Sequence, residues 1–169
     1  MKTEIALYDA FTEVPFGGSQ AAVIADAEAI PADLRPRIAR ELGMPATAFV
    51  DAIDGDQVTV QFHSTVMELP MCGHGTVCLM THLAESGLVE LERANKRGLN
   101  LHLPKGSARV ELERRADDRV EVMLEVTPPR FESAPADIET AARALGLSTS
   151  DFATAAPVEV ARGDFVHLV

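Results

Sequence analysis

Residues 68–76 are Glu68-Leu69-Pro70-Met71-Cys72-Gly73-His74-Gly75-Thr76, a run that places a thiol, two glycines and an imidazole at the start of a helix. The apolar pattern predicts this helix from about His74 to Ser86, with Gly87 just past its end. The first backbone N–H groups of a helix have no partner inside it, and the peptide dipoles leave partial positive charge there. We therefore expect this run to attract an anionic ligand.

The residue types of this run suggest a division of roles. Gly73 and Gly75 lack side chains, so a substrate carboxylate can approach the backbone amides of residues 73–76, up to Thr76. The field of the helix is expected to lower the pKa of Cys72 and to favour its thiolate. His74 would orient the substrate or supply a proton. A carboxylate anchor beside a thiolate base is suited to moving a proton next to a carboxyl group.

Each of these residues also has a purely structural interpretation. Free cysteine is among the most buried residue types, so Cys72 could be a packing residue. His74 is more often a helix-capping or core residue than a ligand. Cys78 lies further into the helix, and we interpret it as a core residue. The spacing alone leaves both interpretations of Cys72 open.

Three ordered segments resemble the signatures of the phenazine-biosynthesis isomerase (PhzF-like) family. They are residues 9–23, residues 38–50, and Phe62 and Glu68 together with residues 72–76. Residues 71–76 are also similar to proline racemases and hydroxyproline epimerases, which share the diaminopimelate-epimerase-like fold. The resemblance implies an α+β lobe in which a mixed sheet wraps around a central helix.

The resemblance further implies an isomerase or epimerase that needs no cofactor and acts on a small amino-acid-like or cyclic acid. Cys72 lies where racemase-like relatives keep a thiol base, and Ser19 could hydrogen-bond the substrate. Ser19-Gln20 replaces the usual asparagine-proline, and Ala46 stands where the phenazine isomerase has a proton-shuttling glutamate. An alanine cannot carry a proton, so Cys72 and His74 are the better catalytic candidates.

Composition limits the other possibilities. The net charge of −11 argues against a nucleic-acid surface, which needs basic patches. Two cysteines six residues apart give no disulfide framework and favour a cytoplasmic location. The five histidines show no metal-ligand spacing, so no metal is expected. No signal segment opens the chain, and no apolar run is long enough to cross a membrane.

The remaining pattern predicts alternating strands and helices. Strands are expected at 4–11, 21–24, 47–53, 58–62, 99–103, 108–115, 119–126 and 164–169, and further helices at 31–42 and 138–145. The Thr127-Pro128-Pro129 run is the best domain boundary. We interpret residues 1–126 as a complete N-terminal lobe, and residues 127–169 as a linker and the beginning of an incomplete second lobe.

The expected two-lobed site has consequences for assembly. In the implied family the substrate lies between two lobes, and residues 165–169 would form an unpaired apolar strand. We expect a homodimer or a second polypeptide to supply the missing lobe. The competing hypothesis is a non-catalytic binding or assembly subunit that retains the lobe without the full proton relay. The sequence does not distinguish an epimerase from an isomerase or a dehydratase.

Overall fold

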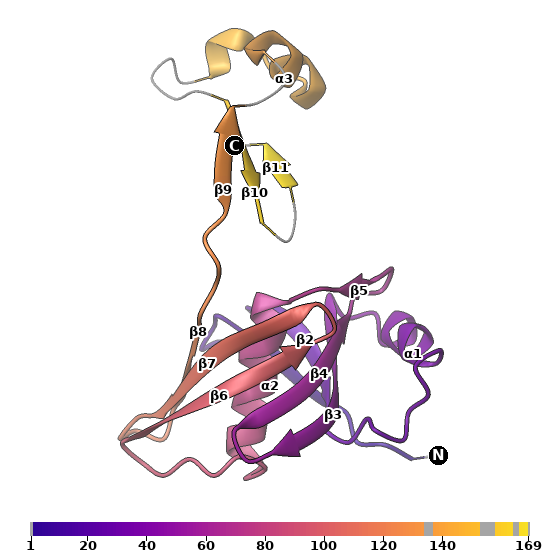
Figure 1. Cartoon of the computed structure of the whole chain (residues 1–169), viewed down its shortest axis with the longest axis vertical. Helices are drawn as coiled ribbons and strands as arrows, with labels where there is room; N and C mark the ends of the chain where they lie inside the picture. The colour runs from indigo at the N-terminus through magenta and orange to yellow at the C-terminus, as the bar shows by residue number, and fades with distance from the viewer. Residues whose placement is uncertain (1, 134–136, 153–157, 164–165, 169) are drawn as a thin grey trace. The chain divides into compact units, whose positions relative to one another are not determined.

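The computed structural model describes residues 2–133, 137–152, 158–163 and 166–168 (Figure 1). Contacts between residues divide the chain into two compact units, Met1–Glu125 and Val126–Val169. The division falls just before the Thr127-Pro128-Pro129 run. That the second unit is the beginning of a lobe stays a prediction.

The first unit is built on one curled, mixed sheet. Its strands are β1 (Ala6–Ala10), β2 (Ser19–Ile24), β3 (Ala46–Asp54), β4 (Gln57–His63), β5 (Glu68–Leu69), β6 (Asn95–Leu103), β7 (Gly106–Arg114) and β8 (Val120–Leu124). They follow the order β1-β2-β3-β4-β6-β7-β8, and β5 pairs with β4. The pairs β2–β3 and β4–β6 are parallel, and the other pairs are antiparallel. This mixed sheet confirms the α+β class expected from the sequence.

Helix α2 (Gly73–Glu85) lies inside the curl of the sheet (Figure 1). It packs against β2, β3 and also both end strands, β1 and β8. Leu79, Met80 and Leu83 are fully buried among aliphatic side chains of the sheet. Because the chain has no tryptophan and only 5% aromatic residues, aliphatic side chains supply most of this core. The predicted helix from His74 to Ser86 is confirmed to within one residue at each end.

Helix α1 (Arg35–Leu42) covers part of the other face of the sheet, over Phe49. It begins later than the predicted Pro31, with a proline in its first turn, and ends at Gly43 with a left-handed φ of 69°. Arg35 is buried and forms an ion pair with Asp51. Its guanidinium also donates to two loop carbonyls, so the charge is well satisfied.

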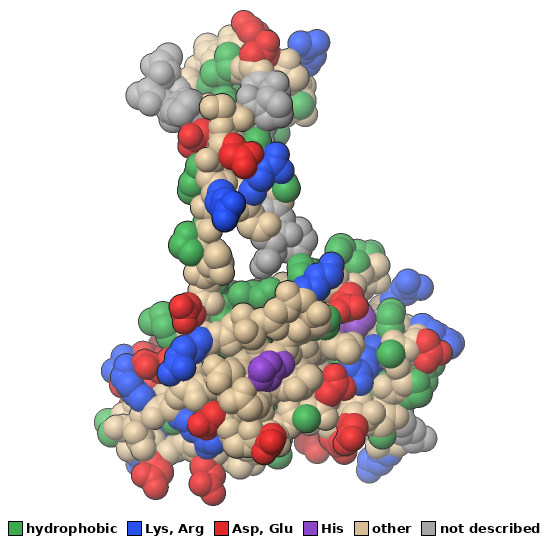
Figure 2. Space-filling model, viewed as in Figure 1, with side chains coloured by type: hydrophobic (Ala, Val, Ile, Leu, Met, Phe, Trp, Pro, Cys, Tyr) green, Lys and Arg blue, Asp and Glu red, His purple; other side chains and the backbone are tan. Residues whose placement is uncertain are grey.

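Charged side chains of the first unit are mixed in sign on the face shown in Figure 2. Lys96 pairs with Glu111, and Arg115 pairs with Glu121, across the strands that end the sheet. Among the described residues, no helix is both long and apolar enough to cross a membrane.

The second unit contains a small sheet and a helix. Its elements are β9 (Arg130–Ser133), α3 (Ile138–Leu145), the 3-10 turn η1 (Thr149–Asp151), β10 (Glu159–Arg162) and β11 (Val166–Leu168). Asp137 caps α3 by accepting from the Thr140 N–H, and Gly146 ends it.

The expectation that the terminal strand is unpaired is wrong. Residues Val166–Leu168 pair antiparallel with β10, which itself pairs with β9. The sequence pattern did not predict β9 and β10, because each strand is only four residues long. Residues 164, 165 and 169 of the predicted strand lie outside the described residues.

His63 provides a test of this fold through its pH dependence. It is 4% exposed, and its ring nitrogens have no hydrogen-bond partner among the described residues. Burial lowers its pKa, nearby Arg35 lowers it further, and Glu68 opposes both effects. Below about pH 6.5 the unfolded chain therefore binds a proton at His63 more readily than the folded chain does. The free energy of unfolding consequently falls as the pH drops from 7 to 5.

Urea denaturation of His63→Leu and of wild type across this pH range measures the effect. This one proton should contribute at most about 1.4 kcal/mol per pH unit to the fall in the wild-type free energy of unfolding, and His63→Leu should make the slope shallower by that contribution. The exposed His102→Asn variant is the matched control and should keep it. Equal slopes for all three proteins would contradict the assignment.

Candidate active site

The Cys72–His74 pair lies at the N-terminus of α2. Cys72 is the residue before the helix, with an extended backbone, and its side chain forms no capping hydrogen bond. Its Sγ lies 3.6 Å from Nδ1 and 3.9 Å from Nε2 of His74. The backbone of Gln20, at the start of β2, is close enough to the imidazole to raise its pKa. The fold thus brings a thiol and an imidazole into contact, near the start of β2.

The protonation state of Cys72 differs from the one expected. Burial raises the pKa of Cys72, and the nearby backbone N–H of Gly75 only partly offsets this. The expected lowering of its pKa is therefore wrong, because loss of solvation outweighs the effect of the Gly75 N–H. Burial also lowers the pKa of His74. At neutral pH the pair is a neutral thiol beside a neutral imidazole.

The two glycines of the motif have different surroundings. A Cβ placed on Gly73 would meet nothing within 4 Å, so its backbone is open to approach. A Cβ on Gly75 would lie 3.0 Å from Cys72 Sγ and 3.1 Å from Phe62 Cδ1. The missing side chain of Gly75 thus makes room for Phe62 and Cys72 and not for a ligand, which differs from the expectation. The binding role of the Gly75 amide stays a prediction.

Thr76 and Ser19 are the two other predicted substrate contacts. Thr76 is fully buried, its N–H donates to the Cys72 carbonyl at 2.8 Å, and its Oγ1 has no partner among the described residues. Its amide is therefore already used within the helix. Ser19 precedes Gln20, and its carbonyl lies 3.9 Å from Sγ of Cys78. The predicted substrate contacts of both residues stay predictions.

Cys78 and Ala46 line the interior beside the site. Cys78 is 1% exposed, and burial raises the pKa of its thiol to about 11, with nearby Cys72 adding to the shift. These values agree with the core role expected for it. Ala46 is fully buried opposite Ala21 in the parallel β2–β3 ladder. Ala46 therefore lies opposite the residue that follows Gln20 in β2. Its side chain is only a methyl group, which cannot transfer a proton.

A family model for phenazine biosynthesis-like proteins matches residues 8–169. The chain belongs to this family. The uncharacterized isomerase YddE of Escherichia coli K12 is 34% identical over 164 residues, which are 95% of this chain and 53% of that protein. The trans-2,3-dihydro-3-hydroxyanthranilate isomerase of Pseudomonas fluorescens is 30% identical over 155 residues, 91% of this chain and 51% of that protein. The chain thus spans about half the length of these relatives.

Solved structures give the same assignment. A PhzF-family phenazine biosynthesis protein from Bacillus anthracis superimposes with a TM-score of 0.78 at 28% identity, covering 95% of this chain and 53% of that one. A hydroxyproline epimerase from Agrobacterium vitis shares the fold, with a TM-score of 0.58 at 13% identity over 89% of this chain and 48% of that one. The resemblance to the PhzF-like family and to the epimerase fold is therefore confirmed.

The Gln20 backbone is the part of the site that sequence reasoning missed. A contact made by the backbone does not depend on the residue type, so only the register of β2 could have indicated it. No cluster of three or more potential metal-binding side chains occurs in the described part of the chain.

The different surroundings of the two glycines predict different effects of adding a methyl group. Gly75→Ala should lower the free energy of unfolding by about 1–3 kcal/mol, because the Phe62 ring and Cys72 must move. Gly73→Ala is the matched control, and its free energy of unfolding should be unchanged or slightly raised. Chemical denaturation measures both, and equal stabilities of the two variants would contradict the packing role of Gly75.

Proposed function

We propose that this protein is an isomerase or epimerase that moves a proton at a carbon next to the carboxylate of a small acid. The observation that carries the proposal is the 3.6 Å contact between Cys72 Sγ and His74 Nδ1 at the uncapped N-terminus of α2. The names of the relatives, both isomerases and epimerases, support the reaction class. No cofactor takes part in the proposed reaction.

The neutral pair suits the proton transfers of such a reaction. The substrate carboxylate binds at the open backbone of Gly73 and at the N–H of His74. The imidazole takes the thiol proton, and the thiolate then takes the proton on the carbon beside the carboxylate. The charge that develops on the carboxylate oxygens is stabilised by the helix amides. Return of the proton to carbon restores the neutral thiol and imidazole.

The number of proton carriers separates two reaction types. One thiol on one face of the substrate can return the proton to a different carbon of that face, which is an isomerisation. An epimerisation needs a second acid on the opposite face, and Ala46 supplies none. This lobe alone therefore favours an isomerisation, and a partner lobe would be needed for epimerisation.

The second candidate function is a non-catalytic subunit that binds a carboxylate or a partner chain. Ala46, in place of a glutamate, favours it. Such a subunit would keep the anion-binding helix N-terminus but would show no proton exchange on any bound acid.

We also propose that a second copy or a second polypeptide completes the site, and that the protein works in the cytoplasm. Phe11, Val14 and Phe16 are exposed on the turn that leads into Ser19. Phe11 and Phe16 both have a φ of 63°, a strained value for residues with a side chain. Asp9 holds the turn by accepting from the Phe16 N–H at 2.9 Å. A strained apolar turn beside the site suits contact with another protein surface.

Exchange of substrate protons with deuterium oxide tests the activity. NMR should show deuterium on the carbon that carries the carboxylate, in hydroxyproline itself and in the isomerised product of trans-2,3-dihydro-3-hydroxyanthranilate. Cys72→Ala should abolish the exchange, and His74→Gln should slow it by about 10²–10⁴-fold. Cys78→Ala, which removes the core thiol, is the matched control and should retain the rate. Exchange that survives Cys72→Ala, or is absent for both acids in the wild type, would contradict the proposal.

Sedimentation over a dilution series tests the assembly. A dimer or a complex with a second polypeptide should bury at least about 1,000 Å² in total, and Phe16→Ser should weaken it. Val66→Ser, at a similarly exposed position away from this turn, is the control. A stable monomer that exchanges substrate protons at full rate would rule the assembly out.

A further inference from the structure

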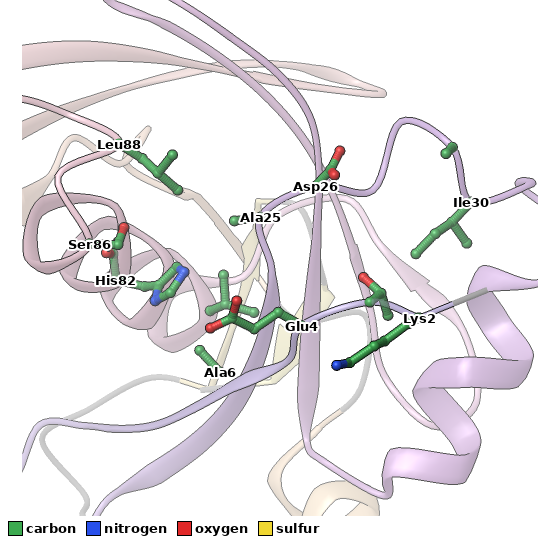
Figure 3. A pocket seen from close by; sticks show the side chains of 12 residues that line it. Lys2, Glu4, Ala6, Ala25, Asp26, Ile30, His82, Ser86 and Leu88 are labelled. Carbon is green, nitrogen blue, oxygen red and sulfur yellow. Dashed lines mark hydrogen bonds between the residues drawn. The ribbon is translucent and has the colours of Figure 1, made fainter.

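A cavity of about 460 Å³ lies at the other end of α2 (Figure 3). His82 on its wall is ten residues beyond Cys72, which places it about 15 Å further along the helix axis. The walls come from the segment before β1, the end of β2, the loop that follows, and the end of α2. This volume is within the range of small-molecule sites, and the cavity is separate from the Cys72–His74 pair.

The cavity combines apolar walls with a few polar groups. The apolar part consists of Ala6, Val23, Ala25, Ala29, Ile30 and Leu88. Val23 and Ile30 are buried, so this wall is part of the packed core and is preformed. The hydrocarbon portion of a small ligand would find apolar contacts along this wall.

The hydrogen bonds of Tyr8 determine which nitrogen of His82 carries the proton. The Tyr8 hydroxyl donates its single proton to Glu85 Oε2 at 2.9 Å. The same oxygen lies 3.3 Å from His82 Nδ1, so in this contact it can only accept. Nδ1 of the neutral imidazole is therefore the protonated nitrogen. Nε2 is then left with a lone pair and is an acceptor.

The other polar groups of the cavity are mainly acceptors as well. The Glu4 carboxylate points toward the His82 ring in Figure 3, yet no hydrogen bond or ion pair among the described residues joins the two. Asp26 adds a second carboxylate at the rim. Two carboxylates against the one ammonium of Lys2 leave the lining negative, and the C-terminal end of α2 adds partial negative charge.

We propose that this cavity is a second binding site, for a primary ammonium group carried on a short hydrocarbon chain. The ammonium donates to the Glu4 carboxylate and to Nε2 of His82, and the hydrocarbon lies against Val23 and Ile30. A primary ammonium has three donors and no acceptor, which matches a set of acceptors. Tyr8 is a positioning residue, because it holds the acceptor nitrogen of His82 toward the ligand. The site does not depend on the proposed function.

NMR titration of the full chain with n-butylammonium tests the site. Saturable shifts are expected at Glu4, His82 and Ser86. Glu4→Gln should weaken binding by about tenfold, because a charge-assisted hydrogen bond is lost. Glu28→Gln lies in the neighbouring loop outside the cavity, and this control should bind like wild type. Equal affinities of the two variants, or no saturable shift in wild type, would overturn the proposal.

Two further probes distinguish recognition of the N–H donors from recognition of the positive charge or of the hydrocarbon chain. Tetramethylammonium has the charge but no N–H, and 1-butanol has the hydrocarbon but no charge, so both should bind more weakly than n-butylammonium. Tyr8→Phe should reduce affinity for n-butylammonium and leave the weak 1-butanol binding unchanged. If 1-butanol binds as tightly as n-butylammonium, the cavity is only an apolar pocket and the proposal fails.

Discussion

The enclosure of α2 by the curled sheet is the constraint on which the other features depend. The helix contacts both end strands of the sheet, and most of its middle, including Leu79, Met80 and Leu83, is buried. Its N-terminus carries Cys72 and His74, and its C-terminal turns carry His82. The two candidate sites thus lie on one buried element, separated along its axis.

Burial of the same helix also sets the chemistry of its first turn. Loss of solvation keeps Cys72 a thiol and His74 a neutral ring, although the helix N-terminus favours a thiolate. A neutral pair can both give and take a proton, which a permanent thiolate cannot do. The close packing of Gly75 on Phe62 holds the thiol in place. Packing and protonation state are therefore two consequences of one arrangement.

Much of the fold could be predicted from local sequence signals. The Asp54-Gly55-Asp56 turn indicated the β3–β4 hairpin, and Gly43 marked the end of α1. The motif itself indicated α2 and the position of Cys72 at its start. These signals are local, so they do not need the rest of the fold to be known.

What could not be predicted depends on contacts between distant segments. The pKa of Cys72 depends on how many sheet residues surround it, and the sequence does not show this. The contact of Gln20 with His74 depends on strand register, and the tautomer of His82 depends on Tyr8, 74 residues away. The short strands of the second unit were missed because four residues are too few to show a periodic pattern.

The rate of iodoacetamide labelling of each cysteine, followed from pH 7 to 10, tests the central claim most directly. The account predicts that Cys72 reacts before Cys78, that its rate keeps rising above the ordinary thiol pKa of about 8.5, and that benzoate slows it. His74→Gln should lower the Cys72 rate at neutral pH and leave the Cys78 rate unchanged. Equal labelling of both cysteines, without protection by the carboxylate, would contradict a functional Cys72–His74 pair.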